Sequence, residues 1–262
     1  MDPEAVLDLA RRRADEAEVV LRRAIDIKER QLGPGHPSTA VSYSVLGAIL
    51  TAQGRLDVAE AMMRRAIASM PVTAGDGTLG GAYTGLSNIL LAQGRLEEAA
   101  TLTEQALALK RTEGASADPN FGATLFELGK IRLRQGRPEE ALPLLREAVE
   151  VIRTTLPDRQ AVHVRPLTLL AQAEELTGQR AAATNYLRQS VEAAKASLPE
   201  THLTRTIAVA NLGVALQGWG ASAEALPVLR ESGAALIDRT NSRGSNDPEA
   251  RRDLDDLRPV FR

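Results

Sequence analysis

Residues 46–59 read Leu46-Gly-Ala-Ile-Leu-Thr-Ala-Gln-Gly54-Arg55-Leu-Asp-Val-Ala59, and variants of this stretch recur along the chain. The stretch joins the end of one apolar-periodic segment to the start of another through a Gly-Arg turn. The glycine returns at positions 94, 136, 178 and 220, at intervals of 40, 42, 42 and 42 residues, and an alanine follows five positions after each glycine. One helix–turn–helix unit repeated at a fixed period predicts hairpins that stack on one another, because no single hairpin can bury its apolar face alone.

The composition favours closely packed helices. Of the 262 residues, 44% are hydrophobic and only 3% are aromatic, so the core has to consist of Ala, Leu, Val and Ile. Such side chains suit helix-on-helix packing better than a sheet, in which β-branched and aromatic residues are favoured. Together with the repeat, the composition predicts an all-α fold, an α-solenoid of about five helix hairpins plus terminal capping helices.

Charge and cysteine content argue against several classes of protein. The formal net charge is -2 with no long block of one sign, whereas a nucleic-acid-binding surface needs clustered basic residues. The chain has no cysteine, which excludes disulfides and thiolate metal sites. The first twenty residues carry charges throughout, and no apolar run approaches the ~20 residues that span a bilayer. We therefore expect a cytoplasmic protein that binds neither nucleic acid nor membrane.

Breaker residues divide the expected single array, residues 1–262, into repeats. Five full repeats are expected at 38–72, 79–112, 119–155, 160–197 and 201–239, each with a shorter first helix and a longer second helix. Residues 1–32 form an N-terminal cap or half repeat, in which residues 3–31 are either one long helix or a bent pair. A charged capping helix at 247–260 gives the array a polar C-terminal end.

Large and small residues recur in phase within these repeats. The first copy reads Tyr43-x2-Leu46-Gly47-x2-Leu50 and then Ala59-x3-Met63, and a later copy places Leu125, Leu128, Gly129, Ala141, Leu145 and Ala148 at the same positions. This pattern resembles the tetratricopeptide repeat (TPR), and the resemblance implies that the all-α array is a right-handed α-solenoid. The 42-residue period and the phrase Glu140-Ala-Leu-Pro-Leu-Leu-Arg-Glu-Ala148 are similar to the longer, kinesin-light-chain type of that repeat, which is common in bacterial signalling proteins. The small residues mark the expected contacts between the two helices of a hairpin.

The residues that could carry chemistry have simpler explanations. Gly75-Asp-Gly-Thr-Leu-Gly80 matches a dinucleotide fingerprint in letters, but it follows a helix and not a strand. His36 and His202 share one repeat position, where they are expected to cap first helices, and Ser38 is a further candidate N-cap. Together with His163 they lie too far apart along the array to bind one metal ion. We expect no cofactor, no metal site and no enzymatic activity.

The resemblance implies a binding groove. In TPR proteins the first helices line a concave face that binds extended or helical peptides. Phe126, Lys130 and Arg134 follow one another at i, i+4 steps and combine an apolar anchor with two cations. Carried over position by position, the groove is expected to contain Ser44, Thr84, Asn88, Phe126, Lys130, Arg134, Arg165, Thr168, Gln172, Asn211 and Gln217.

The sequence therefore predicts a non-enzymatic protein–protein interaction module that binds a peptide or protein segment in the groove of a TPR solenoid. We expect this module to be a monomer. Because similar arrays are often attached to catalytic domains, the alternative is a regulatory or sensor segment of a signalling enzyme, or a free-standing regulator for one. The enzymes considered are a kinase, a protease or a nucleotide-switch ATPase. Self-association through an uncapped end is a third possibility.

Overall fold

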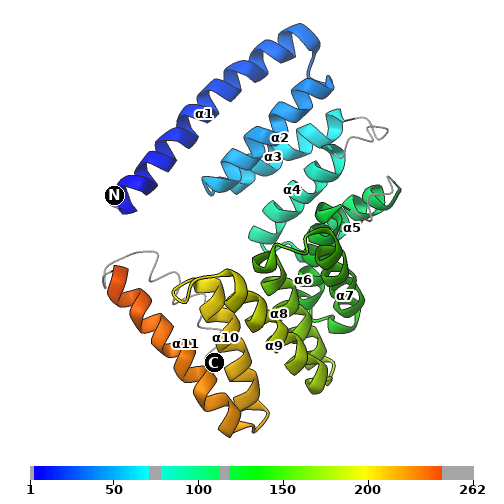
Figure 1. The fold of residues 1–262 in the computed structure, drawn as a ribbon. Helices are drawn as coiled ribbons and strands as arrows, with labels where there is room; N and C mark the ends of the chain where they lie inside the picture. Colours follow the sequence, from blue (N-terminus) through cyan, green and yellow to red (C-terminus); the bar gives the residue numbers. More distant parts are fainter. Residues whose placement is uncertain (1–2, 71–77, 113–117, 244–262) are drawn as a thin grey trace. The chain divides into compact units, whose positions relative to one another are not determined.

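The computed structural model describes residues 3–70, 78–112 and 118–243. All regular structure in these residues is α-helical (Figure 1). The helices are α1 Pro3–Leu32, α2 Pro37–Ala52, α3 Leu56–Ser69, α4 Thr78–Ala92, α5 Leu96–Thr112, α6 Pro119–Arg134, α7 Pro138–Thr155, α8 Gln160–Leu176, α9 Arg180–Ser197, α10 Leu203–Gly218 and α11 Ser222–Arg243. The all-α fold of repeated hairpins is thus confirmed. The capping helix expected at 247–260, and most of the fingerprint that ends at Gly80, lie outside the described residues.

The chain divides into two compact units, residues 1–116 (unit 1) and 117–262 (unit 2). Unit 1 contains α1 and the hairpins α2/α3 and α4/α5, and unit 2 contains the hairpins α6/α7, α8/α9 and α10/α11. Within each unit, successive helices pack against one another, and the first helices of neighbouring hairpins also touch. Each unit is therefore a short stack of hairpins whose first helices share a face. The repeat boundaries within the array stay a prediction.

A glycine in the left-handed backbone conformation ends every first helix. Gly54, Gly94, Gly136, Gly178 and Gly220 have φ between +72° and +83°, a region in which a Cβ atom is disfavoured. After α2, the amide of Arg55 donates to the carbonyl of Leu50 at 2.9 Å, and the amide of Gly54 donates to that of Thr51 at 3.0 Å. These two bonds form a Schellman cap, which satisfies carbonyls at the end of the helix. The periodic glycine of the sequence is therefore a requirement of the turn.

Small residues against large ones set the distance between the two helices of a hairpin. A Cβ atom added at Gly129 would lie 2.6 Å from Cγ of Leu145, and one added at Gly213 would lie 2.7 Å from Cδ2 of Leu229. On the second helices, the periodic alanine is fully buried in every hairpin, at Ala59, Ala99, Ala141, Ala183 and Ala225. Since any larger side chain would separate the helices, these positions stay small.

Helix starts bear out two of the expected caps and correct the third. Nδ1 of His36 accepts the amide of Ser38 at 3.1 Å, and Nδ1 of His202 accepts the amide of Thr204 at 3.2 Å. Ser38 itself lies inside α2 and is not the N-cap, because the helix already begins at Pro37. His163 is buried within α8, and its Nε2 lies 3.0 Å from the carbonyl oxygen of Leu156.

Two expectations about helix length are now decided. Residues 3–32 form one continuous helix, α1, of 30 residues. The rule of a shorter first helix fails in the first hairpin, where α2 has 16 residues and α3 has 14. The chain leaves α3 into an extended conformation at Met70, so this second helix ends early.

Buried tyrosine Tyr43 connects α1 to the hairpin that follows. Its hydroxyl donates to Glu29 of α1 and accepts from Arg65 of α3 at 2.8 Å. The Arg65 guanidinium also lies 4.4 Å from the centre of the Tyr43 ring. Burial, together with the Glu29 carboxylate, raises the pKa of Tyr43 to about 12. The phenol therefore stays protonated and continues to donate at any physiological pH.

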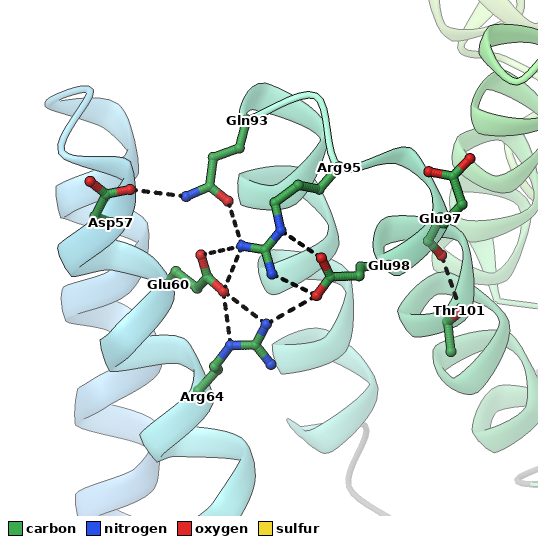
Figure 2. Close-up of polar contacts among 8 residues, drawn as sticks. All are labelled: Asp57, Glu60, Arg64, Gln93, Arg95, Glu97, Glu98 and Thr101. Atoms are coloured by element: carbon green, nitrogen blue, oxygen red, sulfur yellow. Dashed lines mark hydrogen bonds and ion pairs between the residues drawn. The ribbon is translucent and has the colours of Figure 1, made fainter.

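Ion pairs link neighbouring hairpins at the turns. Arg55 pairs with Glu18 at 2.7 Å, and one repeat later Arg95 pairs with Glu60 at 2.7 Å. Figure 2 shows the second pair extended into a network, because Arg95 also contacts Glu98 at 2.6 Å and Arg64 contacts Glu60 at 2.8 Å. Burial alone would raise the pKa of Glu60, but the hydrogen bonds from Arg64 and Arg95 outweigh it and lower that pKa. The carboxylate thus favours the folded state.

We expect Gly129→Ala to destabilise unit 2 by about 1–2 kcal/mol, because the gain in helix propensity is smaller than the cost of pushing fully buried Leu145 aside. Gly233→Ala in α11 is the matched control. A Cβ there meets nothing within 4 Å, so we expect about 0.5–1 kcal/mol of stabilisation. Urea denaturation followed by circular dichroism measures both, and equal effects would contradict the packing explanation.

Glu60→Gln should weaken the protein at pH 7 by about 1 kcal/mol and reduce its sensitivity to acid. The folded-state pKa of Glu60 is lowered, so its contribution is complete above the unfolded pKa of roughly 4.3 and is lost as the pH falls through the folded value. Thermal melts between about pH 5 and pH 3 should therefore show a smaller decrease in Tm for the variant. Glu97→Gln, an exposed carboxylate in the same region (Figure 2), should follow the wild type.

Candidate functional site

The first helices of unit 2 line a hollow of about 530 Å³. Three helices contribute to it: Phe126 and Lys130 come from α6, Arg165 and Leu169 from α8, and Ile207 from α10, while Val164, Thr168, Thr204 and Ala208 complete the lining. These helices touch in the order α6, α8, α10, so their i, i+4 positions align into one surface. The repeat therefore brings together residues that are about one repeat period apart in sequence.

Two cations lie over the ring of Phe126. The Lys130 ammonium is 5.8 Å from the ring centre, and the Arg165 guanidinium carbon is 6.0 Å from it. Both distances are within the range of cation–π attraction. This arrangement holds two positive charges at the edge of an apolar floor.

The two cations differ in their other contacts. Lys130 forms an ion pair with Glu127 one turn earlier on α6. Arg165 is exposed, and within the described parts of the chain no carboxylate lies within 4 Å of its nitrogen atoms. Arg165 is thus the cation whose guanidinium remains available to a ligand carboxylate.

Thr168 lines the hollow but does not offer its hydroxyl. That hydroxyl donates to the carbonyl of Val164 at 2.9 Å and lies 2.8 Å from the hydroxyl of buried Ser190 on α9. The methyl group of Thr168 is left to line the hollow. Its contribution to binding is therefore apolar.

The structure brings together only part of the residue set predicted from the sequence. Phe126, Lys130, Arg165 and Thr168 meet in the hollow, as described. Four others lie on the same three helices but outside its lining; Arg134, Gln172 and Gln217 are exposed and Asn211 is half-buried. The remaining three, Ser44, Thr84 and Asn88, belong to unit 1.

Unit 1 presents a first-helix surface of different chemistry. Helices α2 and α4 contain no charged residue, and α2 exposes Val41 and Val45 to about half of their area. The Thr84 hydroxyl donates to the carbonyl of Gly80, whereas the buried Ser44 hydroxyl has no hydrogen-bond partner among the described residues. The hollow of unit 2 is therefore distinguished by its charge.

Two other hollows in unit 2, of about 370 and 570 Å³, occupy the same repeat position and are weaker candidates. Both lie between successive second helices and the start of a first helix. Polar side chains at their rims already pair with each other: Lys195 contacts Glu231 at 2.7 Å, and Arg153 donates to Gln189 at 3.4 Å. We attribute these hollows to the geometry of the stack.

Sequence reasoning missed a buried carboxylate in unit 2. Glu174 on α8 is 1% exposed and accepts two hydrogen bonds from Arg146 of α7, at 2.8 and 3.2 Å. The signal was available in the repeat, because three of the four equivalent positions are the buried leucines Leu50, Leu90 and Leu216, and the fourth, Arg132, pairs with Glu140 at 3.1 Å. A charged residue in a leucine position requires a partner.

The family comparison agrees with this architecture. Helical hairpins with a Gly turn, an alanine seam and a shared first-helix face define a TPR-type repeat protein. The family of MalT-like TPR regions matches residues 5–231, and the chain belongs to that family. No curated protein matches the chain.

Solved structures extend the likeness to the kinesin-light-chain type of repeat, which confirms that part of the resemblance. A putative kinesin light chain from Podosopora anserina with nearly identical TPR-like repeats is 25% identical over 78% of this chain and 97% of its own, with a TM-score of 0.67. BtubC (BKLC) from P. vanneervenii is 17% identical over 87% and 90%, also at 0.67. YrrB, a TPR protein with an unusual peptide-binding site, is 19% identical over 84% and 94%, with a TM-score of 0.56.

Membrane spans and metal clusters are both missing from the part of the chain that the structure describes. No helix there is both long enough and apolar enough to cross a bilayer. In the same residues, His, Asp and Glu side chains form no group of three that could hold a metal ion.

A repeat fold of the TPR type is typical of protein–protein interaction modules.

We expect Arg146→Ala to destabilise unit 2 by about 2–3 kcal/mol, because Glu174 would stay buried without its partner. Arg188→Ala, the equivalent position on α9, removes a pair between exposed side chains and should cost less than about 0.5 kcal/mol. Adding Glu174→Leu to Arg146→Ala should restore most of the loss, since leucine occupies this position in other repeats. Denaturant midpoints measure all three variants, and failure of the rescue would contradict the explanation.

Proposed function

We propose that this chain is a non-enzymatic interaction module whose unit 2 binds a short acidic peptide segment in the hollow between α6, α8 and α10. The observation that carries the proposal is that Lys130 and Arg165 both lie over the ring of Phe126. An apolar surface with cations at its edge suits a ligand that combines an apolar side chain with a carboxylate.

The ligand can be described from the lining. Its apolar side chain would pack on Phe126, Leu169 and Ile207, and its carboxylate would pair with Arg165 and, more weakly, with Lys130, because Glu127 competes for that ammonium. Neighbouring packed helices are about 8–10 Å apart, so three first helices span about 20 Å. An extended segment of about six residues covers that distance.

The other predicted groove residues are proposed to extend this contact. Arg134, Gln172, Asn211 and Gln217 lie on the same three helices and would meet the ligand on either side of the hollow. In unit 1, Ser44, Thr84 and Asn88 would form a separate, uncharged contact surface. A cytoplasmic location stays a prediction.

A second candidate function is regulation of a signalling enzyme, and the match to the MalT-like TPR family supports it. In this case the hollow would hold a segment of a kinase, a protease or a nucleotide-switch ATPase. The two functions share one binding chemistry. They differ in whether docking changes the activity of the partner.

Charge reversal in the hollow is the direct test. The probe is a fluorescein-labelled octapeptide, Gly-Ser-Asp-Leu-Glu-Leu-Ser-Gly, whose binding is followed by polarisation. We expect a Kd in the range of tens of micromolar for the wild type and at least a tenfold weaker Kd for Lys130→Glu with Arg165→Glu, equivalent to about 1.4 kcal/mol or more. Glu127→Gln should tighten binding severalfold, because it frees Lys130.

Controls separate this site from general electrostatics. Arg153→Glu reverses an exposed charge on α7, outside the hollow, and should leave the Kd within about twofold. Replacing Asp and Glu of the probe by Asn and Gln should weaken binding by at least tenfold. Equal binding of the acidic and neutral probes, or unchanged affinity of the double reversal, would refute the proposed site.

A further inference from the structure

Beyond α11, the chain continues with a segment whose side chains match the hollow of unit 2. Residues 253–257 read Asp253-Leu254-Asp255-Asp256-Leu257, and we call them the acidic segment. Among the stretches outside the described residues, only this one joins leucine to carboxylates. The ligand derived above for the hollow has the same two components, an apolar side chain and a carboxylate.

In an extended conformation, the acidic segment would have two faces of different order. Successive side chains of an extended chain point to opposite sides. Asp253, Asp255 and Leu257 would therefore share one face, and the other would hold Leu254 and Asp256. On the first face, Asp255 and Leu257 would lie about 7 Å apart. This face would thus present a carboxylate and an apolar group next to each other.

The hollow offers the complementary groups at a similar spacing. The Arg165 guanidinium carbon is 6.0 Å from the centre of the Phe126 ring, and the apolar lining continues from that ring onto α8 and α10. With Leu257 packed on this lining, Asp255 would lie beside Arg165. A hydrogen bond between a carboxylate and a guanidinium is among the stronger ones in proteins.

The arginines on either side of the acidic segment are too distant to cancel the charge at its centre. Arg252 and Arg258 are each three residues from Asp255, which is about 10 Å in an extended chain. The Debye length at physiological ionic strength is about 8 Å. The Asp255 carboxylate therefore remains available to pair with Arg165.

The surface next to the end of α11 is less suited to the acidic segment. The hollow of about 370 Å³ there is lined by three carboxylates. Its cations are already paired, Lys195 with Glu231 at 2.7 Å and Arg205 with Glu200 at 3.5 Å. Arg165, in contrast, has no carboxylate within 4 Å of its nitrogen atoms in the described ranges. Charge therefore favours the hollow between α6, α8 and α10.

The chain that leaves α11 is long enough to reach that hollow. Asp238 of α11 and Thr206 of α10 line one hollow, and Ile207, from the same turn of α10, lines the other. The width of α10, about 10–12 Å with side chains, separates the two. From Asp238 to Arg243, α11 adds about 7.5 Å. The path is thus about 20 Å long, whereas residues 244–252 can span about 30 Å.

We therefore propose that the acidic segment occupies the hollow of unit 2 in its own chain, with Leu257 against Phe126 and Asp255 paired with Arg165. This rests on the proposed function of the hollow and adds its regulation, because a partner then binds only by displacing the segment. A short flexible linker gives the segment an effective concentration in the millimolar range. The proposal departs from the capping helix expected at 247–260.

Competition with the labelled octapeptide is the first test, and it uses the full chain. Asp255→Asn with Leu257→Ser should tighten binding of the octapeptide by at least about fivefold, because the tethered segment no longer competes for the hollow. Leu254→Ser with Asp256→Asn is the matched control. It makes the same two kinds of change on the other face, and it should leave the Kd within about twofold of the wild type. Circular dichroism checks that both variants are folded.

Disulfide trapping locates the segment directly. The chain has no natural cysteine, so two introduced cysteines report one contact. Arg258→Cys, next to the acidic segment, should form a disulfide within one chain when combined with Thr204→Cys in the lining of the hollow. The control combines Arg258→Cys with Glu200→Cys, an exposed position beside the end of α11, and should crosslink more slowly.

The outcomes separate this proposal from the proposed function. If the octapeptide binds the wild type and both segment variants with one Kd, the hollow is a peptide site but the acidic segment does not occupy it. If the octapeptide binds none of the three proteins, the peptide site and its occupant are both refuted. Faster crosslinking to Glu200→Cys than to Thr204→Cys, or crosslinks only between two chains of 28.1 kDa, would also overturn the proposal.

Discussion

The close contact of a small residue with the other helix of its hairpin is the constraint on which the rest of the structure depends. There is no room for a Cβ atom where Gly129 meets Leu145 or where Gly213 meets Leu229. The periodic alanines of the second helices are completely buried. Because these contacts set the separation of the two helices, they also set the surface that one hairpin offers to the next. The shared face of first helices, and with it the hollow of unit 2, is a consequence of that separation.

The parts of the fold that sequence reasoning captured are those that repeat. Gly54 and its equivalents recur because a Schellman cap needs a residue in the left-handed conformation. Ala59 and its equivalents recur because the contact between the two helices of a hairpin needs a small side chain there. The sequence alone did not decide whether residues 3–31 form one helix or two, because helix continuity also depends on contacts with α2, such as that of Lys28. Ser38 was assigned as an N-cap, whereas His36, two positions earlier, uses its ring nitrogen for that purpose.

The candidate site was predictable to a similar degree. Phe126 and Lys130 are one helical turn apart, and Arg165 follows at nearly the repeat period, so the sequence placed all three near one another. Which of the other predicted side chains take part in the site depends on details that the sequence does not show. The Thr168 hydroxyl turns to Ser190, and Arg134 lies outside the hollow. Glu174 escaped attention because charged residues at this one position, Arg132 and Glu174, do not change the spacing of the repeat.

The absence of charge in α2 has a consequence for synthesis of the protein. From Gln31 to Gly54 the chain contains no Asp, Glu, Lys or Arg, and the helix formed there buries its apolar side between α1 and α3. Before those neighbours dock, a newly made chain has no electrostatic repulsion in this segment to keep it from other nascent chains. Helix α1, which is rich in charged residues and leaves the ribosome before α2, places its charges next to this uncharged segment during synthesis.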